Sequence, residues 1–166
     1  MRFALMAGLL ASLTIVPAAQ AGWVLHSEPG LGFQANFPAT PTRQESTEDG
    51  VKMTTFAGVA NGVMCLIVAA NYGYTIKPDE ETVASRDNFA KGVSATVSKS
   101  ERIKFPRGAM QLEAMKFDAA SDKYSFRSLI VIDGTWAFQI AGGVPKPDGD
   151  DAELDACVGG LVLLPK

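Results

Sequence analysis

Three residues could carry covalent or acid-base chemistry in this chain: the two cysteines, Cys65 and Cys157, and the single histidine, His26. A cysteine can act as a nucleophile when a neighbouring histidine lowers the pKa of its thiol, because the thiolate is the reactive form. The interpretation we prefer is a disulfide, because neither cysteine lies in a CxxC motif or a metal-type spacing. Such a bridge closes a loop of about 90 residues and stabilises the fold by about 4 kcal/mol. Two buried thiols that never meet are the remaining alternative.

The single histidine excludes several classes of site. A multi-histidine zinc site needs more ligands than His26 alone provides. Because His26 lies close to the expected mature N-terminus, we interpret it as a solvated or strand-edge side chain. The sequence also lacks the GxSxG elbow and the SxxK pair of common exported serine hydrolases. We therefore predict a protein that is not an enzyme, with no catalytic residue, no metal ligand and no cofactor.

Two groups of acidic residues could suggest a site. The segment Asp148–Asp151 invites a calcium loop, but an EF-hand needs glycine at its sixth position, where Glu153 stands. Asp150 and Glu153 have the spacing of a capping box, so we interpret this segment as the start of a helix, with a looser calcium site left open. Glu80 and Glu81 are adjacent, and we expect them to be surface charge.

Two tyrosines form the best candidate binding surface. The segment Tyr72-Gly73-Tyr74 leaves an apolar strand candidate and enters a loop. Aromatic side chains bring a large contact area with a polar handle, and loops often carry binding residues. Packing into the core is the alternative, and it is the one we expect for Trp136, which follows a tight hairpin turn.

The first 21 residues have the pattern of a cleavable secretory signal. Arg2 supplies a positive charge, an apolar stretch follows, and Ala19-Gln20-Ala21 has the small residues that signal peptidase reads. The apolar stretch has about 14 residues, fewer than the roughly 18 to 20 that span a bilayer. We expect cleavage after Ala21, a mature chain 22–166 that forms a single α+β domain without a membrane span, and a periplasmic or secreted location.

The charge of the mature chain argues against nucleic acid as a partner. Removing Arg2 from the 15 basic residues leaves 14 against 18 acidic residues, a net charge of −4. Nucleic-acid binders normally carry a basic excess or a basic stripe. The locally basic segment 99–107 (KSERIKFPR) is interrupted by Glu101, and we interpret it as a solvated strand edge.

Hydrophobic periodicity predicts mostly strands, with one central helix and one closing helix. Asn61-Gly62 and Asp133-Gly134 are typical of tight hairpin turns. The segment Ala39–Gly50 has no periodicity and is interpreted as a loop. The expected strands are Trp23–His26, Phe33–Phe37, Val51–Ala60, Val63–Tyr72, Thr96–Phe105, Ala109–Asp118, Lys123–Asp133 and Thr135–Ala141; the expected helices start at Pro78, with Val83, Phe89, Ala90 and Val93 on one face, and near Asp150.

This order predicts an α+β domain with a mainly antiparallel sheet covered by helices. The opening GFQANFP at Gly32–Pro38, the early hairpin, the Arg127–Ala141 hairpin and the final helix make the chain resemble the PsbP-like sandwich family. That fold occurs in a photosystem II extrinsic subunit, a Ran-binding nuclear import cofactor and many uncharacterised exported bacterial proteins. The resemblance implies a non-catalytic binding or assembly protein, although no ligand-binding residue of a characterised member can be matched here.

We therefore expect an exported module that binds a protein partner or a small envelope ligand. One alternative is an enzyme that uses Cys65 or Cys157 as nucleophile with His26, and another is a structural component of the envelope. A binding module predicts an exposed patch around Tyr72–Thr75. The enzyme predicts that His26 faces a free thiol.

Overall fold

The computed structural model describes residues 22–165, so the expected signal at residues 1–21 and its cleavage site lie outside the described residues. The described chain folds into strands and two helices. In order they are β1 (Val24–Glu28), β2 (Phe33–Phe37), β3 (Thr42–Glu48), β4 (Val51–Ala60), β5 (Val63–Asn71), α1 (Pro78–Gly92), β6 (Thr96–Arg107), β7 (Met110–Ala120), β8 (Tyr124–Asp133), β9 (Trp136–Pro145), α2 (Asp151–Gly159) and β10 (Val162–Leu163).

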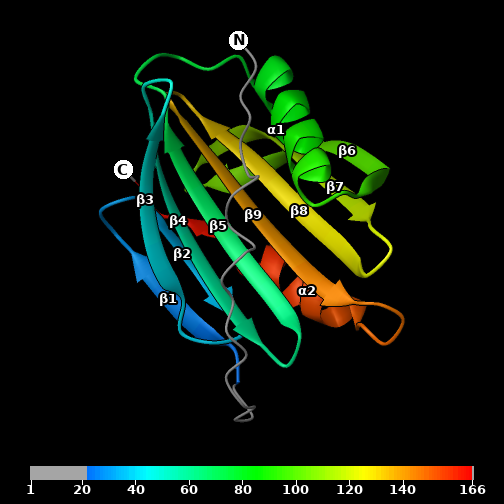
Figure 1. Cartoon of the computed structure of the whole chain (residues 1–166). Coiled ribbons are helices and arrows are strands. Elements are labelled where there is room, and N and C mark those ends of the chain that lie inside the picture. The colour runs from blue at the N-terminus through cyan, green and yellow to red at the C-terminus, as the bar shows by residue number, and fades with distance from the viewer. Residues whose placement is uncertain (1–21, 166) are drawn as a thin grey trace.

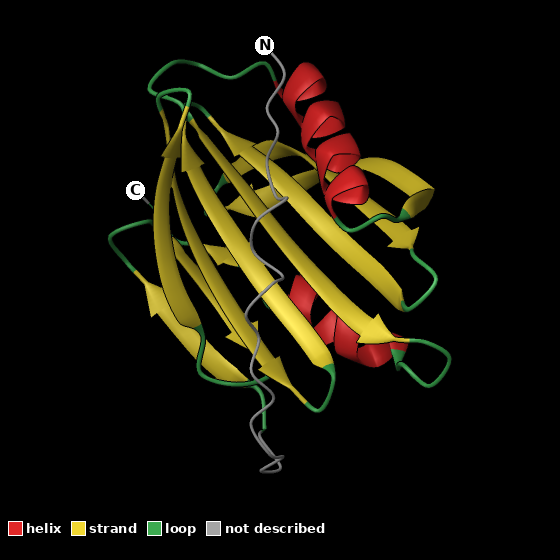
Figure 2. Ribbon diagram, in the orientation of Figure 1, coloured by secondary structure: helices red, strands yellow, loops and turns green. Residues whose placement is uncertain are grey.

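Seven strands form one antiparallel sheet in the order β3-β4-β5-β9-β8-β7-β6, and β1, β2 and β10 form a smaller antiparallel sheet in the order β1-β2-β10. Figure 1 and Figure 2 show α1 on one face of the large sheet, with α2 and the small sheet on the opposite face. The mostly antiparallel sheet with its two helices agrees with the predicted α+β class, although a second sheet supplies part of the cover that we expected from helices.

The face that carries α2 holds one half of the core. In β2, Phe33, Ala35 and Phe37 are buried and alternate with half-buried polar residues, which is the pattern of a strand with one apolar face. They pack against buried side chains of the large sheet such as Phe56 and Phe138. The strand predicted at residues 33–37 is therefore confirmed with the same bounds.

A disulfide joins this face to α2. Cys65 in β5 and Cys157 in α2 are bridged, with 5.8 Å between their Cα atoms and 92 residues between them in sequence. The structure thus contains the bridge that we preferred from the sequence. Helix α2 approaches the sheet closely at Gly142, where an added Cβ would lie only 3.2 Å from the Cβ of Cys157.

Helix α1 covers the other half of the core. Its Phe89 makes edge-on contacts with Phe117 and Phe126, at ring-centroid distances of 5.7 and 5.6 Å. The helix buries Thr82, Phe89 and Ala90, so the predicted face was right in its second half, while Val83 is only half-buried. The prediction for the first turn was wrong because it counted only apolar residues as buried. Thr82 can be buried since its hydroxyl donates to the carbonyl of Pro78 at 2.7 Å.

The predicted loop at Ala39–Gly50 was wrong. Residues Thr42–Glu48 form β3, which pairs with β4 at the edge of the large sheet. Every side chain of β3 is exposed. Because an edge strand can be held by backbone hydrogen bonds alone, its side chains need no hydrophobic alternation, and periodicity gave no signal.

The closing helix begins as its capping residues predict. The Asp150 carboxylate caps α2 by accepting from the backbone N–H of Ala152 at 2.8 Å. Glu153 instead accepts a hydrogen bond from the indole N–H of Trp23 at 3.0 Å, which ties the start of the described chain to α2. Within residues 22–165, neither helix has the length and apolar character that crossing a bilayer requires.

Candidate binding site at the Tyr72 loop

The loop Tyr72–Lys77, which links β5 to α1, is fixed to the hairpin between β8 and β9. The backbone N–H of Tyr72 donates to the carbonyl of Thr135 and that of Ile76 to the carbonyl of Gly134, both at 3.0 Å. Between these anchors Gly73 adopts a φ of 72°, a conformation that suits glycine, and its N–H donates to the Asn71 side chain. The loop is therefore held at both ends.

The two tyrosines of this loop have different environments. Tyr72 is only 6% exposed, whereas Tyr74 is 52% exposed. Their rings meet edge to face, with 5.7 Å between centroids and an interplanar angle of 84°. Tyr74 is thus presented to solvent as the binding hypothesis requires, while Tyr72 is a buried support and not part of the outer surface.

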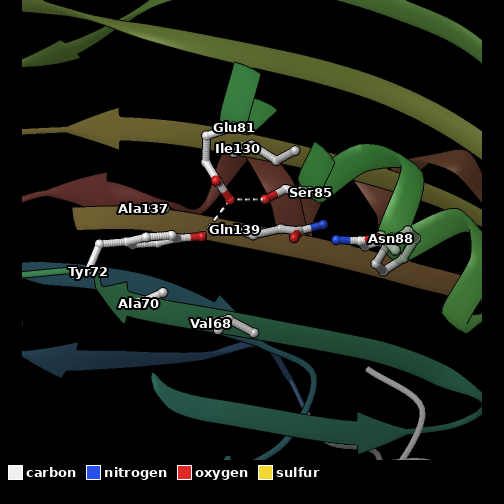
Figure 3. Close-up of a pocket in the computed structure, with 10 residues that line it drawn as sticks. Val68, Ala70, Tyr72, Glu81, Ser85, Asn88, Ile130, Ala137 and Gln139 are labelled. Carbon is white, nitrogen blue, oxygen red and sulfur yellow. Dashed lines mark hydrogen bonds between the residues drawn. The ribbon is translucent and has the colours of Figure 1, made fainter. Parts of the chain in front are cut away.

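Tyr72 is the first member of a hydrogen-bond network with helix α1 (Figure 3). Its hydroxyl donates to Oε1 of Glu81 at 2.5 Å, and the hydroxyl of Ser85 donates to the same oxygen at 2.8 Å. Burial raises the pKa of the Tyr72 phenol well above its usual range, and the hydrogen bond to Glu81 raises it further. The phenol is therefore a neutral hydrogen-bond donor at neutral pH.

A small pocket lies between this network and the large sheet. About 30 Å³ of it is free for the centres of water-sized groups, which is space for one or two waters. Figure 3 shows the aliphatic side chains of Val68 and Ala70 on its floor, and Glu81 and Ser85 bring polar groups to the opposite side. The lining residues are Val68, Ala70, Tyr72, Glu81, Ser85, Asn88, Phe89, Ile130, Ala137 and Gln139.

Glu81 differs from the other carboxylates of α1. Those three each form an ion pair with a cation: Asp79 with Arg102, Glu80 with Lys77 and Asp87 with Arg86. Glu81 faces the sheet, is half-buried and forms no ion pair with any residue between 22 and 165. The pocket therefore holds a carboxylate whose charge the surrounding protein does not neutralise.

Sequence reasoning missed most of this pocket. The expectation that Glu81 is surface charge like Glu80 was wrong, because Glu81 lies on the helix face that Phe89 buries. The signal was present: Glu81, Ser85, Asn88 and Phe89 are spaced i, i+4, i+7 and i+8, which places them on one helix face. Gln139 gave no such signal, since it enters the pocket from the distant strand β9.

The other candidate residues lie apart from this pocket. His26 is on the edge strand β1, with its ring 5.0 Å from that of Phe56 and its Nε2 3.5 Å from a carboxylate oxygen of Glu28. Both cysteines of the chain are in the disulfide, so the thiol-enzyme alternative has no free nucleophile in this state. Across residues 22–165, the Asp148–Asp151 segment included, no group of three or more histidine, cysteine or acidic side chains is placed to hold a metal ion.

Comparison with known proteins identifies the fold. The solution structure of cyanobacterial PsbP (CyanoP) from Synechocystis sp. PCC 6803 superposes with a TM-score of 0.58 over 94% of this chain and 99% of its own, at 9% identity. The chain therefore has a PsbP-like fold, as the resemblance implied. A crystal structure from Bacteroides thetaiotaomicron aligns with 87% of this chain and 49% of its own at 19% identity, but its TM-score of 0.36 is too low to show a shared fold. Neither a protein-family model nor a curated protein matches the sequence.

Proposed function

We propose that this protein is an exported, non-catalytic module that binds a protein partner or a small envelope ligand at the Tyr72 loop. The observation that carries the proposal is the exposed ring of Tyr74 on a loop that is hydrogen-bonded at both ends. A fixed aromatic side chain loses little conformational entropy on binding, and tyrosine is among the residues that dominate binding energy at interfaces.

Two further features support the exported part of the proposal. The sequence begins with the pattern of a secretory signal, and the cysteines form a buried disulfide, a bond that persists in oxidising compartments.

The charge of the chain favours a partner other than nucleic acid. Of the 15 basic residues, 14 remain without Arg2, against 18 acidic residues, which gives a net charge of −4.

Site-specific photo-cross-linking in cells that produce the protein tests this function. We expect a photoreactive residue at position 74 to give a discrete adduct, recovered in the exported fraction on a chain that starts at Gly22. The matched control is position 59, since Val59 is 39% exposed and pairs with Met64, at the opposite end of β5 from Tyr72. An identical adduct pattern at both positions would contradict a binding surface at Tyr74. Recovery of the protein in the cytoplasm, with residues 1–21 still attached, would contradict export.

A further inference from the structure

We propose that the pocket lined by Tyr72 and Glu81 receives a primary ammonium group on an aliphatic stem, as carried by a lysine side chain or a free alkylamine. The inference rests on the proposed function for the source of that ammonium, because a protein partner would supply a lysine and a small ligand would supply a free amine. The chemistry itself follows from what the pocket offers and what it lacks.

The carboxylate of Glu81 supplies an unbalanced negative charge. Two hydroxyls donate to its Oε1, from Tyr72 and Ser85, while its Oε2 accepts no hydrogen bond from residues 22–165. An ionised carboxylate offers about four acceptor positions on its two oxygens. A cationic donor in the pocket would use the vacant positions and neutralise the charge.

The other polar groups leave acceptors as well. The amide nitrogen of Gln139 donates to the hydroxyl of Ser128 at 3.2 Å, and that hydroxyl donates to the carbonyl of Ile140 at 2.9 Å. The side-chain carbonyl of Gln139 receives no hydrogen bond from the described residues, and Figure 3 shows this amide beside Asn88 and Ser85. The hydroxyl hydrogens of Tyr72 and Ser85 are directed to Glu81, and the side-chain amide of Asn88 adds both donors and an acceptor to the lining. The charge of Glu81 then favours a cationic donor as the ligand. An ammonium has three donors and no acceptor.

The size and the floor of the pocket select among cations. The space open to the centres of water-sized groups is about 30 Å³, which suits a compact head group such as an ammonium. The floor of Val68, Ala70 and Ala137 suits methylene groups, which lysine side chains lay along apolar surface. The exposed Tyr74 ring contacts the ring of Tyr72, which lines the pocket.

Titration of the isotope-labelled protein with n-butylammonium, followed by amide chemical shifts, tests the chemistry directly. We expect saturable shifts at Ser85, Asn88 and Gln139 with a Kd of about 1 to 10 mM, a range suited to so small a ligand. Two probes serve as controls on the unmodified protein. Neutral 1-butanol and butyltrimethylammonium, which keeps its charge but has no N–H and a larger head, should each bind at least about tenfold more weakly. Equal binding of the trimethyl compound would overturn the proposal.

A matched pair of variants locates the charge. Glu81→Gln keeps an oxygen for the hydroxyls of Tyr72 and Ser85 and should weaken butylammonium binding by about tenfold or more. Glu80→Gln removes the same charge from the same helix turn on the exposed side, where Glu80 pairs with Lys77, and should change binding by less than about twofold. Thermal unfolding of both variants confirms that they are folded. Equal weakening by the two variants would overturn the assignment to the pocket.

The source of the ammonium is separated by a second pair of probes. Tighter binding of an acetyl-Gly-Lys-Gly-amide peptide than of butylammonium, abolished by acetylation of the lysine, supports a lysine of a protein partner. Tighter binding of butylammonium supports a free amine. If neither binds, the ammonium proposal fails, whereas a position-74 adduct in the cross-linking experiment would still support the proposed function.

Discussion

Asp133 and Glu81 are two carboxylates that the fold removes from bulk water, and they differ in how their charge is balanced. The Asp133 side chain, at the end of β8, is 9% exposed and forms an ion pair with Arg107, whose side chain is 3% exposed. Glu81, on α1, is half-buried and receives only neutral hydroxyl donors from the described chain. The first charge is balanced within the fold. The second is the charge that we propose a ligand neutralises.

The Arg107 ion pair also joins distant parts of the chain. The Nε of Arg107 donates to the carbonyl of Leu164 at 2.8 Å, and the N–H of Leu164 donates to the carbonyl of Gly32 at the same distance. This side chain therefore connects the end of β6, the β8–β9 hairpin and the C-terminal segment. Burial lowers the pKa of the guanidinium, but its ordinary value is so high that it stays charged.

The largest effect is expected when this pair is broken. Arg107→Met removes the guanidinium that pairs with the buried Asp133 carboxylate, and loss of one partner of a buried pair costs about 3 to 5 kcal/mol of unfolding free energy. Denaturant unfolding followed by circular dichroism measures the change. The double variant Arg107→Met with Asp133→Leu should recover part of the loss, because the buried carboxylate is then gone as well. A single variant as stable as the parent protein would show that the pair is not structural.

The same comparison explains what the sequence could and could not predict. The sequence predicted elements that have a regular apolar face or a distinct end. The alternation of Phe33–Phe37 indicated a strand, Asn61-Gly62 indicated a turn, and Asp150 indicated the start of a helix. The disulfide could be predicted because the chain has two cysteines outside any CxxC or metal-type spacing, behind a segment with the pattern of a secretory signal. By contrast, β3 has no buried side chain and could not be recognised by periodicity.

The two charged sites were hidden for a further reason. Arg107 and Asp133 are 26 residues apart, and Glu81 and Gln139 lie on different elements, so only the strand order brings each pair together. The sequence shows only that the helix starts with three acidic residues, from Asp79 to Glu81, a pattern typical of solvated charge. Which of those carboxylates faces the sheet is decided by packing of Phe89 against β7 and β8.

An intermediate effect is expected for Tyr72→Phe, which removes one of the two donors to Glu81. The loss of this hydrogen bond should cost about 1 kcal/mol at pH 7. Because the pKa of Tyr72 is raised in the folded state, its contribution is fully present below pH of about 10, where unfolded tyrosine titrates, and is lost as the pH rises through the higher folded value. The parent protein should therefore lose stability above about pH 10 more steeply than the variant.

Absorbance titration near 295 nm gives the independent check on Tyr72. The chain has three tyrosines, so the difference between the parent and Tyr72→Phe titrations isolates one phenol. Its midpoint should lie above the ordinary value of about 10. A difference curve centred at or below that value would contradict a buried, hydrogen-bonded phenol.

The smallest effect is expected for Glu81→Gln, and it sharpens the comparison most. The amide oxygen of glutamine can still accept from Tyr72 and Ser85, and no cation among the described residues loses a partner, so the unfolding free energy should change by less than about 1 kcal/mol. A gain in stability is consistent with a binding site, since residues kept for ligands are often suboptimal for the fold. Asp133→Asn, measured beside it in denaturant, should cost several times more because Arg107 is then buried without its anion. If Glu81→Gln proved as costly as Asp133→Asn, the Glu81 carboxylate would be part of the structural framework, and the unbalanced charge in the pocket would need another explanation.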